Sequence, residues 1–381
     1  MKGLPWQPGP RLALSAVFWM NGTVFGNWVT RIPAIKEEFA LSEAAIGLVL
    51  LCLGLGALAA MTATGWLLTR VSSRRVVMLS ASGFCLSLAI PALAPNVAVL
   101  VLGVVLLGGC NGMLDIAMNT NGIELEEALG RRIFSSLHGL WSIGGLTGAA
   151  MGGALAEHGV SLPVHFLSVA AGALLFKAFF FSGLRPGAAA EAGEERPPTF
   201  VRPPRALYGL AFIAFSVFLM EGAVADWSGL YLRETLGAGP AVAAAGFAFF
   251  SLCMAAGRLC GDRLHLPAPK LIRLGGVLAL AGLAVALLAP VPAGAVPGFA
   301  LLGLGLSTLF PTVISRAARH PGVPSALGIA AVATAGYTGF LLGPGVIGFV
   351  AEATSVRFAL GLLAGLCAGV MLAARSAKAG A

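Results

Sequence analysis

Long apolar runs separated by short polar turns make up most of this chain, and this pattern limits the fold more than any other feature. Hydrophobic residues account for 58% of the 381 residues, and charged residues for only 10%. A soluble chain of this length could not bury so much apolar surface. Continuous runs of about twenty apolar residues, without alternation, also exclude membrane-spanning strands. The sequence therefore predicts an all-α integral membrane protein.

Each apolar run is long enough to cross a bilayer as a tilted helix. We count twelve of them, at residues 11–34, 43–69, 75–94, 97–122, 133–156, 160–183, 206–232, 239–262, 269–289, 294–317, 324–352 and 356–375. Residues 185–205 are rich in Pro, Ala, Glu and Arg and lack an apolar period, which is typical of a linker. We expect two six-helix bundles, residues 1–184 and 206–381, joined by a cytoplasmic linker at 185–205.

The basic residues predict an orientation. If both termini are cytoplasmic, the 24 Lys and Arg residues lie on that side with few exceptions. Arg31, Lys36, Arg233 and Arg357 fall outside, and Lys177 lies near the inner end of a helix, where its long side chain can reach the cytoplasmic surface. An excess of Lys and Arg marks cytoplasmic loops, so the net charge of +8 indicates orientation rather than a nucleic-acid partner. We expect a multi-pass membrane protein with both termini inside.

Cofactor chemistry has no sequence support. The six cysteines lie singly in apolar runs, and no CxxC pair or His-rich cluster occurs. We therefore expect no disulfide, metal site or cofactor. A Walker motif for ATP and a nucleophile–base constellation for catalysis are also missing, so we do not expect an enzyme.

The two halves of the chain repeat each other. The string MNGTVFGNW from residue 20 is echoed by MEGAVADW from residue 220, with one residue gapped. GLTG from residue 145 is echoed by GYTG from residue 336, and AE at residue 156 by AE at residue 351. The echoes keep their direction across the membrane, which predicts a parallel repeat of six helices plus six.

Twelve runs, a central linker and paired halves resemble the major facilitator superfamily. GWLLTRVSSRR from residue 65 is similar to that family's cytoplasmic Gly-x-Leu-x-Asp-Arg-x-Gly-Arg signature, with Thr69 and Ser72 at its Asp and Gly positions; GRLCGDR from residue 257 is the second-half version. NGTVFGNWVTRIP from residue 21, the Asp115–Asn119 stretch and SSLHGLWSIG from residue 135 resemble a bacterial branch related to the fucose-permease-like sugar:proton symporters. The resemblance implies alternating access, with the helices at 11–34, 97–122, 206–232 and 294–317 lining a central cavity.

The strongest candidate for function is a polar stripe in the run 97–122. Asn111, Asp115 and Asn119 are four residues apart, so their side chains share one face of a helix. A carboxyl group within a membrane helix is costly unless it faces water, a ligand or a partner. We expect Asp115 to couple protons and contact substrate; a structural carboxylate bonded to its neighbouring amides is the alternative.

Other titratable candidates lie at similar depths. His138 falls opposite Asp115 in an antiparallel hairpin, which suggests a proton relay or gate pair, or else a histidine at a helix end. Glu221 and Asp226 cannot share a stripe on a regular helix, and Glu221 occupies the place of Asn21 in the repeat. We expect Glu221 to couple protons and bind substrate, and Asp226 to bind substrate or to pair with Arg31.

The remaining candidates are amides, tryptophans and loop charges. The amides could bond a polyol or bond between helices, and the tryptophans could close over substrate or anchor in the headgroup belt. The substrate-binding candidates are Asn21, Asn27, Trp28, Asn111, Asn119, Trp141 and Trp227. We expect gating by Arg31, Arg70, Arg74, Asp262 and Arg263, for which a solvated loop is the alternative.

Glycine and proline positions predict how the helices pack and bend. Gly144, Gly148 and Gly152 form a four-residue repeat, as do Gly361, Gly365 and Gly369, and such stripes are typical of close helix packing. Pro311 and Pro344 are expected to kink the helices at 294–317 and 324–352.

Together these features predict a secondary active transporter. We expect a monomer that moves a small polar or amphipathic organic solute, sugar-like or a metabolite, by proton-coupled symport. Acids outnumber bases among the candidates, so neutral or cationic solutes fit better than anions. Two other functions stay open: a proton-driven efflux antiporter for drugs or metabolites, and a non-transporting solute sensor.

Overall fold

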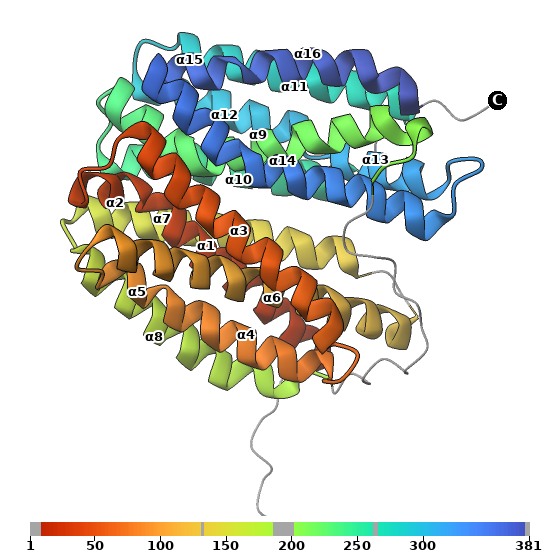
Figure 1. Cartoon of the computed structure of the whole chain (residues 1–381), viewed down its shortest axis with the longest axis horizontal. Coiled ribbons are helices and arrows are strands. Elements are labelled where there is room, and N and C mark those ends of the chain that lie inside the picture. Colours follow the sequence, from red (N-terminus) through yellow and green to blue (C-terminus); the bar gives the residue numbers. More distant parts are fainter. Residues whose placement is uncertain (1–8, 131–132, 186–201, 262–265, 378–381) are drawn as a thin grey trace, which may run out of the picture. The chain divides into compact units, whose positions relative to one another are not determined.

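The computed structural model describes residues 9–130, 133–185, 202–261 and 266–377, and the regular elements among them are helices (Figure 1). The first half contains α1 (Pro10–Thr30), α2 (Ile32–Glu38), α3 (Glu43–Leu67), α4 (Ser73–Ser87), α5 (Ala89–Ala92), α6 (Val97–Leu129), α7 (Phe134–Glu157), α8 (Leu162–Phe180) and η1 (Phe181–Gly183). The second half contains η2 (Arg205–Leu207), α9 (Tyr208–Leu230), η3 (Tyr231–Thr235), α10 (Pro240–Gly261), α11 (Ala268–Leu288), α12 (Pro292–Leu306), α13 (Leu309–Ala318), α14 (Ser325–Ala353), α15 (Val356–Gly361), α16 (Leu363–Ala373) and η4 (Ala374–Ala377).

The all-α membrane fold is confirmed. Within the described ranges, ten helical stretches are long and apolar enough to cross a membrane. Neither α1 nor α7 is among them, although they are 21 and 24 residues long. These two helices carry Asn21, Asn27 and His138, and such polar side chains lower the hydropathy of a helix. The count of twelve spans stays a prediction.

Several expected spans are interrupted, and one interruption has a clear cause. The span expected at 294–317 is divided into α12 and α13 at Ser307 and Thr308. Pro311 has no N–H to bond the carbonyl of Ser307, and its ring crowds that carbonyl, so the helix breaks there as predicted. In contrast, α14 continues without a break through Pro344.

Backbone contacts divide the chain into two compact units. Unit 1 contains Met1–Trp28, Cys52–Gly148 and Val160–Glu194, and unit 2 contains Val29–Leu51, Ala149–Gly159 and Glu195–Ala381. Unit 2 therefore includes α2, the first turns of α3 and the last turns of α7, although these segments belong to the first half of the sequence. The bundles at 1–184 and 206–381 stay a prediction, and most of the expected linker lies outside the described residues.

Small residues let α1 and α7 approach closely within unit 1. A Cβ atom at Gly144 would meet the carbonyl oxygen of Trp19, and one at Gly148 would meet that of Thr23. Close packing along the first glycine stripe is thus confirmed. The prediction was wrong for the second stripe at Gly365, where a Cβ would find nothing within 4 Å.

Candidate functional site

The polar stripe on α6 is partly bonded within its own helix. The amide nitrogen of Asn119 donates to the backbone oxygen of Asp115 at 2.8 Å and to its carboxyl Oδ1 at 3.1 Å. Asn111, Asp115 and Asn119 are all half-buried. The stripe therefore exists as expected, and the coupling role of Asp115 stays a prediction.

Three side chains from three helices of unit 1 form a hydrogen-bonded chain, which we call the Asn21 chain. Trp141 Nε1 on α7 donates to Asn21 Oδ1 on α1 at 2.6 Å. Asn21 Nδ2 then donates to Asn111 Oδ1 on α6 at 2.7 Å. Asn21 is 2% exposed, whereas Asn111 and Trp141 are half-buried. Three of the predicted binding residues are thus brought together, but the side chain of Asn21 is far less exposed than those of the other two.

A second buried polar pair lies farther along α1. Asn27 Nδ2 donates to the backbone oxygen of Thr23 at 2.8 Å, and Asn27 Oδ1 lies 2.7 Å from His165 Nε2 on α8. Asn27 and His165 are almost completely buried. The sequence analysis did not identify His165, because a lone histidine in an apolar run has no spacing signal.

His138 lies in an aromatic environment on α7. Its ring centroid is 5.4 Å from that of Phe18 in an edge-on arrangement, and 4.9 Å from that of Phe134. It precedes Trp141 by three residues, so the two side chains lie on one face of the helix. The pairing of His138 with Asp115 stays a prediction.

In unit 2, Glu221 has a basic partner. Arg258, in the last turn of α10, places its guanidinium nitrogen 3.6 Å from Glu221 Oε2, and both side chains are less than one-fifth exposed. At this distance the two groups form an ion pair, but they are too far apart for a hydrogen bond. The charge count had placed Arg258 among the cytoplasmic basic residues, so it was missed as a partner.

Asp226, which is half-buried, forms no hydrogen bond or ion pair with the described part of the chain.

Two repeat-related tryptophans are buried inside the protein. Trp28 is 1% exposed, with its ring 6.2 Å from that of Phe166, and Trp227 is fully buried. Neither indole N–H has a hydrogen-bond partner among the described residues. Anchoring in the lipid headgroup belt, one of the two interpretations of the sequence, is therefore wrong, because these rings pack against protein.

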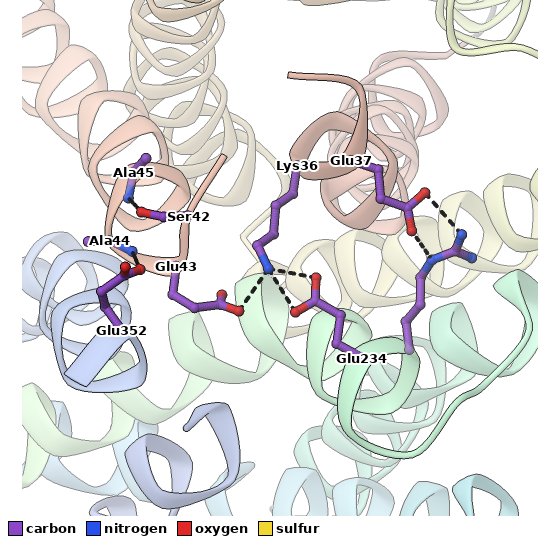
Figure 2. A network of polar contacts seen from close by, with 9 residues as sticks. Lys36, Glu37, Ser42, Glu43, Ala44, Ala45, Glu234 and Glu352 are labelled. Carbon is purple, nitrogen blue, oxygen red and sulfur yellow. Dashed lines mark hydrogen bonds and ion pairs between the residues drawn. The ribbon is translucent and has the colours of Figure 1, made fainter. Parts of the chain in front are cut away.

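A network of charged residues joins distant parts of the sequence within unit 2. We call it the Lys36 network (Figure 2). Lys36 Nζ on α2 donates to Glu43 Oε1 on α3 at 2.7 Å and to both carboxyl oxygens of Glu234 on η3 at 2.8 Å. Arg233 donates from two nitrogens to the carboxylate of Glu37, at 2.7 and 3.1 Å. Each of these contacts with η3 spans nearly 200 residues of sequence.

Two repeat-related glutamates complete this end of unit 2 as helix caps. Glu352, near the end of α14, accepts from the backbone N–H of Ala44 at 3.1 Å (Figure 2). Glu157, at the end of α7, accepts from the backbone N–H of Ala241, also at 3.1 Å. Ala44 and Ala241 are the second residues of α3 and α10. Each carboxylate thus satisfies a free N–H and meets the positive end of a helix dipole.

The electrostatics of Lys36 favour its charged form. Burial alone would lower the pKa of its ammonium, but hydrogen bonds and charge–charge attraction from Glu234 and Glu43 outweigh burial and raise that pKa above 10.5. Lys36 is therefore positively charged at every physiological pH.

The predicted gating residues have separate surroundings. The Arg70 guanidinium lies 4.0 Å from the ring centroid of Trp66, and Arg74 donates to the backbone oxygen of Ser182 at 3.2 Å. Arg31 is 5% exposed, between α1 and α2. Asp262 and Arg263 lie outside the described residues, so their gating role stays a prediction.

Sequence reasoning missed the Lys36 network, although two signals pointed to it. Lys36 and Arg233 are exceptions to the charge bias, so membrane orientation does not explain these two charges. Glu157 and Glu352 occupy equivalent positions in the internal repeat, and two equivalent carboxylates at helix ends indicate a shared structural role.

Comparisons with known proteins match this architecture along most of the chain. The model of the Major Facilitator Superfamily matches residues 14–326. An uncharacterised MFS-type transporter of Yersinia pestis is 33% identical over 377 residues, which covers 98% of this chain and 96% of the relative. The crystal structure of the nucleoside transporter NupG has a TM-score of 0.75 at 15% identity, covering 96% of this chain and 98% of that one. A variant of the E. coli fucose:proton symporter FucP has a TM-score of 0.64 at 16% identity, covering 97% and 98%.

Such identities to solved structures establish the fold, while the family model and the relative establish the family. This chain belongs to the Major Facilitator Superfamily and is a multi-pass secondary transporter.

Proposed function

We propose that this protein is a proton-coupled symporter in the bacterial inner membrane for a small polar or amphipathic organic solute, sugar-like or another metabolite. The names of two structural neighbours, a nucleoside transporter and a fucose:proton symporter, support a hydroxylated solute. The half-buried side chains of Asn111 and Trp141, joined through Asn21, also support it, because small-molecule sites combine aromatic side chains with a few polar groups.

The Lys36 network is the observation that carries the proposal. Within unit 2 it ties α2 and α3, from the first half of the sequence, to η3 of the second half, and the two glutamate caps add the links α3–α14 and α7–α10. An alternating-access transporter needs contacts of this kind that form in one state and break in another. Exposed ion pairs contribute about 0–1 kcal/mol each, so several together can hold a closed state and still be broken.

We assign the network to the outer gate. The charge bias of the loops places the connection between α1 and α2 outside the cytoplasm, and the same bias places both termini inside. In this assignment the described conformation of unit 2 is closed at its outer end.

Proton coupling is assigned to three acid–base groups. Asp115 carries a carboxyl group within the longest helix of unit 1, and His138 can exchange a proton near neutral pH. Glu221 faces Arg258 across a long ion pair, so a change in the charge of the carboxylate would act directly on the guanidinium.

A solute screen tests this function. Purified protein and its Asp115→Asn variant are compared by thermal shift against a metabolite panel at pH 6 and pH 8, with Asn96→Asp at the N-cap of the same helix as control. Hits are then followed in proteoliposomes with an inward proton gradient. Gradient-driven uptake that is lost in Asp115→Asn supports symport. Solute movement opposite to the proton gradient would instead show an antiporter, and binding without flux would show a sensor.

A further inference from the structure

The Asn21 chain has a direction, and its tryptophan sets that direction. An indole N–H donates a hydrogen bond and cannot accept one. The Asn21 atom that lies 2.6 Å from Trp141 Nε1 is therefore the carbonyl oxygen. The amide nitrogen of Asn21 must then face Asn111, and it meets Asn111 Oδ1 at 2.7 Å. The oxygen and nitrogen of an asparagine amide are often hard to tell apart. Here the indole donor fixes the orientation of the Asn21 amide, and Asn21 in turn fixes that of Asn111.

The consequence appears at the far end of the chain. Because its oxygen is held by Asn21, Asn111 turns its NH2 group away from α1. That group bonds none of the described residues, and Asn111 is half-buried. Asn119, one step farther along the same stripe, instead directs its amide nitrogen back to Asp115. Asn111 is thus the stripe amide whose donors are available.

Close packing makes this arrangement rigid. A Cβ atom at Gly22, next to Asn21, would meet the carbonyl oxygen of Trp141. A Cβ at Gly112, next to Asn111, would meet the backbone of Ala57 on α3. The backbones that carry the chain are therefore set by direct contact with neighbouring helices, and the amides cannot drift apart to escape a mismatched pairing.

We propose that Asn21 is a positioning residue that never touches the solute and that makes Asn111 a donor-only subsite. The transported solute must present a hydrogen-bond acceptor there, such as a carbonyl, ring ether or carboxylate oxygen. This inference rests on the proposed transport function and adds a rule for substrate selection. It also changes the role expected for Asn21 from binding residue to determinant of specificity.

The Asn21→Asp variant should invert the subsite. The new carboxylate keeps the size of the side chain and still accepts from Trp141, but it has no donor for Asn111. Asn111 then pairs by turning its NH2 group toward the carboxylate, and its carbonyl oxygen becomes the exposed group. A subsite that selected acceptors would now select donors, without any change in a residue that touches the solute.

A thermal-unfolding cycle tests the direction without any solute. Asn21→Asp and Asn111→Asp each leave one donor facing one acceptor, so each alone should lower Tm only by the cost of burying one carboxyl group, which is larger at Asn21, 2% exposed, than at the half-buried Asn111. The double variant brings two carboxylates together and should lower Tm well beyond the sum of the singles. Pairing Asn21→Asp with Asn96→Asp, at the cap of α6, is the control and should be additive. Additive behaviour of the Asn21 and Asn111 changes would overturn the proposed chain.

Sugar binding tests the specificity. D-glucosamine carries an ammonium group that only donates, and D-glucuronate carries a carboxylate that only accepts. In Asn21→Asp the ratio of the two Kd values should move toward glucosamine by about tenfold, the factor for one lost hydrogen bond. Trp141→Phe adds no charge and frees Asn21 to turn, so it should move the ratio of the two Kd values in the same direction.

The outcomes separate the inference from the proposed function. A shift in Asn21→Asp without any shift in Trp141→Phe would be an effect of charge and would overturn the positioning role. If wild-type protein binds neither sugar, the sugar-like solute of the proposed function fails, and the unfolding cycle alone decides whether Asn21 orients Asn111.

Discussion

Lys36 binds two carboxylates that come from distant parts of the sequence, Glu43 and Glu234. Replacing it by Met keeps the length of the side chain but leaves these two carboxylates facing each other. The three side chains are between 13% and 30% exposed, so water screens the repulsion. We expect Lys36→Met to lower the free energy of unfolding by about 1–2 kcal/mol, measured by thermal unfolding in detergent. Glu38→Gln, an exposed carboxylate on the same helix, is the control, and equal losses in both variants would contradict the role of Lys36.

The pKa of Lys36 predicts how this contribution depends on pH. Burial lowers that pKa, but the combined effect of Glu234 and Glu43 is larger, so the pKa lies above its ordinary value of 10.5. A raised pKa in the folded state stabilises the fold fully below the unfolded value and loses this effect as pH rises through the folded value. The difference in stability between wild type and Lys36→Met should therefore stay constant from about pH 7 to pH 9 and shrink above about pH 10.5. A difference that has already vanished at pH 9 would show that the two carboxylates do not raise the pKa of Lys36.

Helix termini, rather than side chains alone, are the partners of Glu157 and Glu352. Glu157→Gln and Glu352→Gln keep an oxygen that accepts the backbone N–H and remove only the charge that meets the helix dipole. Ala244, on α10 against Gly153, is 6% exposed and serves as a reporter after Ala244→Cys. We expect Glu157→Gln to increase labelling of this reporter by an impermeant maleimide about two- to fivefold, the factor for one charge–dipole interaction. Labelling is read at the peptide level, and unchanged labelling would mean that the cap does not hold α7 on α10.

Helix packing makes the two glycine stripes unequal. Gly144→Ala would press a methyl group against the backbone of Trp19, which cannot move away without shifting α1. We expect it to reduce stability by about 1–3 kcal/mol in thermal unfolding. Gly365→Ala, in the other stripe, meets open space and should change stability little. Similar losses at both positions would show that the contact with Trp19 does not decide the effect, since helix propensity alone favours Ala over Gly.

At the scale of the whole molecule, the helices were predictable because lipid leaves a spanning chain few alternatives. Backbone N–H and C=O groups must be bonded within the segment, so continuous apolar runs indicate helices. The rotation of each helix about its axis was not predictable, since it depends on packing between segments far apart in sequence. Asn111 and Asp115 were therefore found from their spacing alone, whereas the pairing of Lys36 with Glu234 and of Glu221 with Arg258 required coordinates. The buried Trp28 shows the same limit, because its sequence position alone suggested a headgroup anchor.

Alternating access makes a final prediction about the molecule as a whole. If the Lys36 network is a gate, transport requires Glu37 and Arg233 to separate in each cycle. Both side chains are partly exposed, so cysteines at the two positions can be joined by a reducible bismaleimide. We expect joining to stop proteoliposome flux of a screen hit while thermal stability is kept, and reduction of the spacer to restore flux. Single-cysteine variants treated with the same reagent control for modification itself. Continued flux in the joined protein would show that this end of unit 2 stays closed throughout the cycle, and the gate would then have to lie elsewhere.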